Sequence, residues 1–401
     1  MQVQIMIVRV LYSIWLLSLP FGLYPLIGSL SLDNILAPVV CAFVFLRPGS
    51  INSRVLKGKA GIILTTAAFF FVYSLARMFS VADNLDYLSF TFFLILKQFL
   101  YFFIPIFFIR SLADWRLTSR LLVIVALVGV FSALIASLGL YEFPVQRFAQ
   151  SRLGVEILKK AVGLFANYGD MAILGSYALL YMYLVESQWG WLRKWVATLI
   201  LLAGYLGAQS RNMYFTLLTG VFSAFYFSRF SRGGAGSNTL SLITLLAISL
   251  LGVIIFSLLN VDLLADIKAI GGTHEAAATV DDRLGQYQYA WSIIKNNWLF
   301  GDGGPLIRYG IQVHNIWLGQ LALGGIVGAL AILGLFAAPF TRFLVLKVSG
   351  ESQRIRVLGM SQLICMFLAS EFYPSLSYIF LVILGILSVL PVVTACSVNK
   401  G

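Results

Sequence analysis

The chain has 401 residues, of which 60% are hydrophobic and only 11% are charged, and its mean hydropathy is +0.91. Soluble domains carry about 25% charged residues, so this composition excludes a string of soluble domains and indicates an integral membrane protein. The net charge of +12 suggests nucleic-acid binding at first sight, but the placement of the charges argues against it.

Apolar runs of about 20 residues, each long enough to cross a bilayer, recur along the chain. Backbone groups in lipid need partners within the segment, so these runs are predicted to be helices. We expect an all-α polytopic protein with about twelve spans in a single integral membrane domain, 1–401. No cleavage-type signal follows the first run, which is therefore expected to be retained. The expected spans are 7–28, 33–46, 60–79, 89–109, 119–140, 169–186, 192–209, 211–229, 240–260, 314–338, 355–371 and 375–396.

The basic residues are distributed unevenly between the two sides of the membrane. Most of the 28 lysines and arginines fall in segments that are cytoplasmic if the N-terminus is inside. This positive-inside bias predicts that both termini are cytoplasmic. It also explains the net positive charge, so we expect the protein to contact membrane lipids and not nucleic acid. In a bacterium, the protein would lie in the inner membrane, with the polar loops 141–168 and 261–313 in the periplasm.

The sequence offers no motif for a metal or a nucleotide cofactor, and we expect neither. Cys41, Cys365 and Cys396 lie in apolar segments, without the spacing of a disulfide framework or a metal site. The run Gly301-Asp-Gly-Gly304 follows a helical pattern rather than a strand, so it is predicted to be a turn.

The large loop, 261–313, contains a predicted amphipathic helix over 282–298. Asp281 and Asp282 can cap its start. Its apolar residues recur at spacings of three and four, and Asn296-Asn297 and the glycines end it. We expect this helix to form an ordered cap that rests on the membrane surface or on the tops of the spans. The apolar stripe consists of Leu284, Tyr287, Trp291, Ile294 and Trp298.

Two cations fall inside expected spans. Arg77 and Lys97 are functional candidates because ionisable groups are rare within membranes. Arg77 is close enough to the outer end of its span to reach the interface, whereas Lys97 is deeper. Glu371 or Asp170, each at an outer helix end, could balance one of these charges.

Three further arginines lie on the predicted periplasmic side. Arg147 and Arg152 in the first loop are either solvated or bind an anionic substrate. Arg211 follows Ser210 at the outer junction of two spans. It either reaches the interface or makes a bidentate contact with a phosphate.

The large loop and the span that follows it supply the remaining candidates. Arg283 either pairs with the neighbouring aspartates or is oriented by them into a cleft. His314, one of two histidines in the chain, begins a span beside Asn315. Either residue could cap the helix, or the imidazole could take a proton from a sugar hydroxyl.

In order and topology, these motifs resemble the O-antigen ligase and polymerase superfamily of bacterial membrane glycosyltransferases. The similarity covers roughly residues 160–335, and the segment 163–167 adds a weaker element. The sequence departs from the family pattern at Leu323, where a glutamate is common, and after Asn167, where Pro-Asn is common. The motifs are Ser210-Arg211, Asp282-Arg283 with the run from Trp291 to Gly303, and His314-Asn315 with Leu318 and Gly324-Gly-Ile-Val-Gly328.

The resemblance implies a GT-C-like fold and a metal-independent, inverting glycosyltransferase. Its donor would be a glycan linked to undecaprenyl diphosphate. Arg211 and Arg283 would bind the diphosphate and stabilise the leaving-group charge. His314 would act as base for the acceptor hydroxyl or orient it. Further contacts to substrate would come from Asn315, Lys97, Arg77, Arg147 and Arg152.

Three functions remain open at this stage. A ligase, which we favour, transfers the glycan to a sugar of lipid A–core oligosaccharide. A polymerase transfers it to another lipid-linked repeat unit. A transporter or flippase would instead use Arg77, Lys97 and Glu371 as a charge pathway, but the internal repeats common in transporters are not evident.

Overall fold

A computed structural model describes most of the chain, and at some positions, including Arg77, Arg211 and Arg283, it describes only the backbone. The described residues are 2–21, 25–27, 30–46, 60–81, 85–141, 163–165, 168–208, 211–230, 274–302, 313, 315–346, 350–370 and 377–398.

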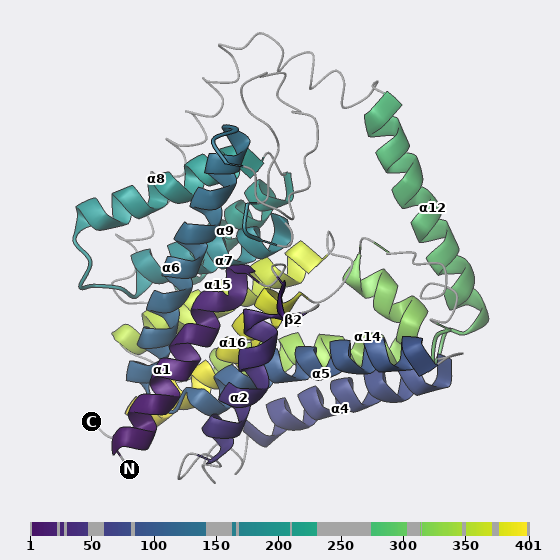
Figure 1. Cartoon of the computed structure of the whole chain (residues 1–401), viewed down its shortest axis with the longest axis horizontal. Coiled ribbons are helices and arrows are strands. Elements are labelled where there is room, and N and C mark those ends of the chain that lie inside the picture. The colour runs from purple at the N-terminus through teal and green to yellow at the C-terminus, as the bar shows by residue number, and fades with distance from the viewer. Residues whose placement is uncertain are drawn as a thin grey trace.

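Helices account for nearly all of the described chain (Figure 1). The first half contains α1 (Gln2–Ser18), η1 (Leu19–Phe21), β1 (Pro25–Ile27), β2 (Leu30–Ser31), α2 (Leu32–Leu46), α4 (Ala60–Val81), α5 (Leu85–Phe108), α6 (Leu112–Ser137) and α7 (Tyr168–Leu184). The second half contains α8 (Trp191–Ala208), α9 (Arg211–Phe230), α12 (His274–Asn296), α14 (Ile316–Val345), α15 (Glu351–Ala369) and α16 (Tyr378–Val398).

The helices match the hydropathy pattern, and the chain is helical with the apolar helices of a membrane protein. Every expected span except 240–260, which lies outside the described residues, overlaps a helix, although 7–28 and 314–338 differ from the helices in detail. Among the described residues, 4 helices are long and apolar enough to cross a membrane. These are Val3–Phe21, Leu112–Ser137, Ile316–Val345 and Tyr378–Ser397.

The first span ends earlier than the predicted 7–28. α1 stops at Ser18, and the short antiparallel hairpin of β1 and β2 follows. Pro20 lies in the 3-10 turn η1, where its ring removes a backbone donor and prevents the helix from continuing. This short hairpin interrupts a chain that is otherwise helical over nearly all of its described residues.

Neighbouring helices alternate in direction, as side-chain contacts at different heights show. α6 and α7 are antiparallel, because the start of α6 meets the later part of α7 through the bond from Trp115 Nε1 to Tyr177 Oη (3.2 Å). Near the other end of α6, Ser132 Oγ accepts a bond from the backbone of Leu164, just before α7. α5 and α16 are parallel, because Lys97 contacts Tyr378 at the start of α16, while Phe102, later in α5, contacts Gly385, later in α16.

This alternation gives the bundle two distinct ends. We call the end where α7 and α16 begin the cap end, since Asp170 and Tyr378 lie near each other there, and the end where α6, α8 and α15 begin the basic end. α7 is buried from Asp170 to Leu184, so it forms part of the core of the bundle. α12 stands at the edge of the bundle, beside α14 (Figure 1).

Ion pairs fasten the helices together at the basic end. Arg9 of α1 binds Asp114 of α6 at 2.8 Å. Two more arginines of α6 bind the start of α15 and the segment after α7. These pairs are Arg116–Glu351 and Arg120–Glu186. α6 thereby connects three other parts of the bundle.

Glu186 is the only one of these three carboxylates that lies outside a helix, and only 2% of its side chain is exposed. Burial raises the pKa of the Glu186 carboxyl, but hydrogen bonds from Arg120 and the backbone of Gln188 outweigh burial and hold the pKa below its ordinary value. A carboxyl with a lowered pKa stabilises the fold above its ordinary pKa, and this contribution is lost as the pH falls through the folded-state value.

We therefore expect Glu186→Gln to lower the stability of the purified protein at pH 7 by about 1.5–3 kcal/mol, the usual value of a buried, charge-assisted hydrogen bond. The difference should shrink as the pH falls below about 4. Thermal unfolding of both proteins across this pH range measures it. The control is Glu351→Gln, because Glu351 and Arg116 are both about two-fifths exposed and such pairs contribute at most about 1 kcal/mol. Equal losses in the two variants would contradict the assignment.

Candidate functional site

α14 is folded back on itself at Gly325. The backbone of Gly325 is non-helical, with φ 60° and ψ −161°. The ring centroids of Trp317 and Phe336 lie only 5.8 Å apart, although a straight helix would separate them by about 28 Å. α14 is therefore a helical hairpin with a first arm, 316–324, and a second arm, 326–345. This differs from the single span expected over 314–338.

The segment that follows α12 fills the apex of this hairpin. The carbonyl of Trp298 accepts a bond from Ile326 N (2.9 Å), and that of Leu299 accepts one from Val327 N (3.4 Å). In return, Asp302 N donates to the carbonyl of Ala322 at 2.9 Å. The ends of both arms thus find backbone partners in this segment, 297–302, which we call the plug.

A tyrosine from a distant helix completes the apex. Tyr73 of α4 donates its hydroxyl to the carbonyl of Gly324 at 2.7 Å and lies 3.4 Å from the carbonyl of Phe300. The same side chain therefore contacts both the hairpin and the plug. Because α4 also packs along the second arm, through Thr66 and Gly334, the apex is held on two sides.

Two glycines permit this close approach. A Cβ on Gly325 would lie 2.3 Å from the backbone of Leu299, and one on Gly301 would lie 2.5 Å from the backbone of Gly325. Both glycines also have positive φ, 60° and 69°, which side-chain-bearing residues rarely adopt. Both glycine runs are evident in the sequence, but nothing in their spacing predicts that they meet.

α12 is held against the first arm of α14 by a small apolar cluster. Ala290, Ile293 and Ile294 of α12 are buried against Val313 and Ala322. The helix begins at His274, earlier than the predicted 282, and ends at Asn296 rather than 298.

The buried face of α12 differs from the predicted stripe. Ile294 is buried and Tyr287 packs against the same cluster, as expected, but Trp291 and Trp298 are 51% and 60% exposed. The helix is turned so that alanine and isoleucine meet the first arm, because these smaller side chains allow close packing. The two tryptophans are on the exposed side of this segment.

The first arm begins inside the bundle rather than at its rim. Asn315 is the N-cap residue, and its Oδ1 accepts a bond from Leu318 N at 2.9 Å. Its capping role is thereby confirmed. Ile316 is buried, and Trp317 lies against Phe367 at the end of α15, with ring centroids 4.7 Å apart. His314 itself lies outside the described residues.

A buried group of polar side chains lies near the start of α16. Lys97 Nζ is 3.6 Å from Asp33 Oδ2 and 3.7 Å from the ring centroid of Tyr378. The hydroxyl of Tyr101 also donates to Asp33. Asp170, at the start of α7, is close enough to Tyr378 to act on it electrostatically. We call these five residues the polar floor of the cap end.

The polar floor explains how Lys97 is tolerated within a helix. Its charge is compensated by Asp33, which the sequence analysis did not single out. The proposed partner Glu371 lies outside the described residues. A deep cation requires a nearby acid, so Asp33, at the outer end of the second expected span, could have been considered as a third candidate.

The remaining site residues are placed only in part. Arg211 is the first residue of α9, Arg283 lies within α12, and Arg77 lies within α4; their side chains are outside the description, as are Arg147 and Arg152 entirely. α12 contacts α14, whereas α9 packs mainly on α7 and α15. The convergence of Arg211, Arg283 and His314 therefore stays a prediction. Within the described residues, no cluster of His, Cys, Asp and Glu is arranged to hold a metal ion.

Comparisons with known proteins do not place the chain in a family. No protein-family model matches it, and no curated protein matches it significantly.

The plug predicts a specific sensitivity to a methyl group at the apex. Gly325→Ala should destabilise the purified protein by about 3 kcal/mol or more, because it adds backbone strain and also pushes the plug away. Gly139→Ala is the matched control, since Gly139 has φ 69° with nothing within 4 Å of an added Cβ. That variant should lose only about 1–2 kcal/mol. Thermal unfolding distinguishes the two, and equal losses would mean that the plug is not seated at Gly325.

Proposed function

We propose that the protein is an O-antigen ligase of the bacterial inner membrane. It transfers glycan from undecaprenyl diphosphate to a sugar of lipid A–core oligosaccharide at the periplasmic face. The observation that carries the proposal is the contact between two of the motifs on which the family resemblance rests. The run ending in Trp298–Asp302 is hydrogen-bonded to the run Gly324–Val327, although they are separate in sequence.

This contact supports a shared site at the cap end. It fixes α12, which carries Arg283, against the arm that His314-Asn315 begins. Arg211 begins α9, which packs beside α7, and α7 begins at the same end with Asp170 of the polar floor. In the proposed site, Arg211 and Arg283 bind the diphosphate, while His314 orients or deprotonates the acceptor hydroxyl.

The proposed topology has about twelve spans, with the cap end in the periplasm and both termini in the cytoplasm. The alternation of helix direction supports it, because each expected periplasmic loop then attaches at the cap end. The arginines Arg9, Arg116 and Arg120, which the positive-inside rule assigns to the cytoplasm, gather at the other end.

A transporter is the alternative that the broken helix α14 raises, since transporters bind substrates at the ends of half-helices. In this chain, however, the backbone groups of Ile326, Val327 and Ala322 are already bonded to the plug. They are therefore not free to bind an ion or substrate. A polymerase remains compatible with the same contacts, and it differs from a ligase only in its acceptor.

Substitution of the three proposed site residues tests the proposal. Arg211→Ala, Arg283→Ala and His314→Ala should each reduce transfer by about 10²–10³-fold, because each removes stabilisation of developing charge or positioning of the acceptor. Arg283→Lys should also be impaired if the contact is bidentate. Lys295→Ala, on the exposed last turn of the same helix α12, is the matched control and should retain activity.

The assay uses purified protein reconstituted in lipid vesicles with labelled carrier-linked glycan and lipid A–core acceptor, without nucleotide or metal ion. Product should form. Near-normal transfer in all three variants would rule out this site, and movement of the glycan across the membrane without bond formation would favour the transporter.

The lipopolysaccharide pattern of cells distinguishes ligase from polymerase. If the chain is a ligase, deletion of its gene should leave fully polymerised glycan unattached on the carrier lipid. If it is a polymerase, deletion should leave core carrying a single repeat unit.

A further inference from the structure

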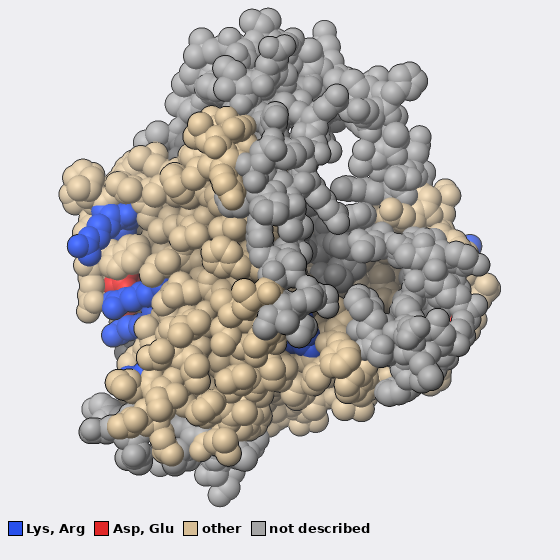
Figure 2. All heavy atoms as spheres, viewed as in Figure 1, with Lys and Arg blue, Asp and Glu red and all other residues tan. Residues whose placement is uncertain are grey.

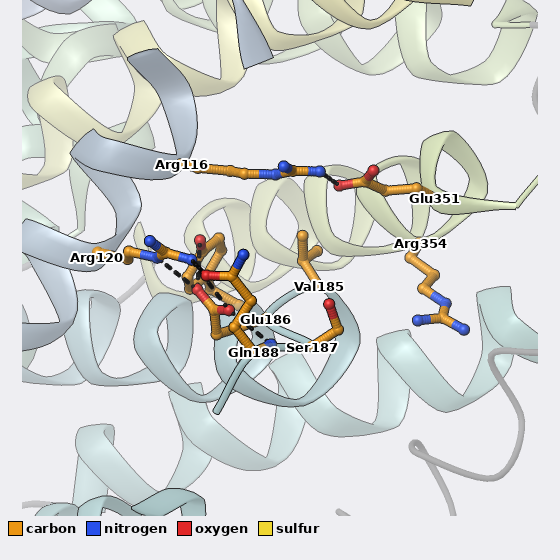
Figure 3. A pocket seen from close by; sticks show the side chains of 9 residues that line it. Arg116, Arg120, Val185, Glu186, Ser187, Gln188, Glu351 and Arg354 are labelled. Atoms are coloured by element: carbon orange, nitrogen blue, oxygen red, sulfur yellow. Dashed lines mark hydrogen bonds and ion pairs between the residues drawn. The ribbon is translucent and has the colours of Figure 1, made fainter. Parts of the chain in front are cut away.

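A small cavity opens at the basic end, away from the proposed glycan site. Its volume is about 140 Å³, and it lies between the first turns of α6, the segment after α7 and the first turn of α15. Figure 3 shows the side chains around it, which include three arginines and two glutamates: Arg116, Arg120, Arg354, Glu186 and Glu351.

Two of the arginines are neutralised, and the third is not. Arg116 binds Glu351, and Arg120 binds Glu186 and also the amide oxygen of Gln188. Arg354 forms no ion pair with any described residue, and in Figure 3 its guanidinium stands apart from both pairs. The cavity therefore keeps one uncompensated guanidinium.

The surroundings add to this positive charge. Lys194, at the start of α8, is close enough to act electrostatically on both Glu186 and Arg354. Counting Lys194, the cations of the cavity exceed its acids by two. Basic side chains also gather on one flank of the molecule, with a smaller acidic patch between them (Figure 2). A concave site with a net positive charge attracts anions, even though two of its arginines are paired with glutamates.

The neighbouring surface of α8 is apolar and exposed. Trp191, Leu192 and Trp195 are all exposed, and they lie in the first turns of this helix. Tryptophans at the end of a membrane helix sit at the level of lipid headgroups. An acyl chain could therefore lie along α8 while its headgroup enters the cavity.

We propose that this cavity binds the phosphate of an anionic ligand, with Arg354 as its principal contact. A guanidinium offers the paired donors that phosphate oxygens accept. The headgroup of an anionic phospholipid in the cytoplasmic leaflet is the source that the exposed face of α8 favours, and free phosphate is the other source of the same chemistry. The site would make the protein responsive to lipid composition on the face opposite to its proposed chemistry.

The test is a binding titration of the purified full chain in detergent by native mass spectrometry. The protein should bind phosphatidylglycerol more tightly than phosphatidylcholine. Arg354→Gln should weaken phosphatidylglycerol binding at least about tenfold, the loss expected for one charge-assisted contact. Arg354→Lys should restore part of it.

Arg356→Gln is the matched control, because it makes the same charge change on the same helix. The Arg356 guanidinium donates instead to the carbonyl of Leu344 at 3.0 Å. This variant should bind phosphatidylglycerol like the unaltered protein.

Sodium phosphate, added as competitor, identifies the source. Displacement of the lipid would assign the site to phosphate in general, and persistence would assign it to the lipid headgroup. Equal binding by the unaltered protein and Arg354→Gln, equal losses in Arg354→Gln and Arg356→Gln, or no preference between the two lipids would overturn the proposal. No glycan substrate is needed, so the result is independent of the proposed transfer activity.

Discussion

The need to satisfy every backbone group at a broken helix governs the cap end of this protein. Within an apolar environment, a peptide group without a partner costs at least about 1–3 kcal/mol, because no water replaces the lost bond. Gly325 interrupts α14 and frees donors and acceptors on both arms. The plug accepts hydrogen bonds from the second arm and donates one to the first arm. Tyr73 donates a hydrogen bond to the carbonyl of Gly324. The break and the plug therefore depend on each other for backbone hydrogen bonds.

This dependence fixes the position of everything attached to the plug. α12 ends at the plug, so its apolar cluster is brought against the first arm. The first arm, in turn, begins inside the bundle at Asn315, near the last turn of α15 and the first turn of α16. The polar sequence of the loop 261–313 would place it in solvent, but its described part, α12 and the plug, packs against α14. The compensated Lys97–Asp33 pair shows that polar groups are tolerated beneath it, provided that they are paired.

The sequence predicts the helices well, because length and hydropathy suffice to locate apolar runs. It also predicts the helical part of the large loop and the capping role of Asn315. It does not predict the fold of α14, since Gly324-Gly325 is compatible with a straight helix until the plug is placed beside it. The pairing of Lys97 with Asp33 joins residues far apart in the chain. The early end of the first span could have been anticipated, because Pro20 falls within the expected range.

Cysteine cross-linking between the plug and the second arm tests the central claim most directly. Trp298 and Ile326 are both exposed, and their backbones are hydrogen-bonded at 2.9 Å, so Trp298→Cys with Ile326→Cys should disturb the fold little. In native membranes, and with Cys41, Cys365 and Cys396 replaced, this pair should cross-link as readily as Thr66→Cys with Gly334→Cys, which reports the packing of α4 on the second arm. If the second pair cross-links and the first does not, the plug is not seated in the break, and the account of the cap end is wrong.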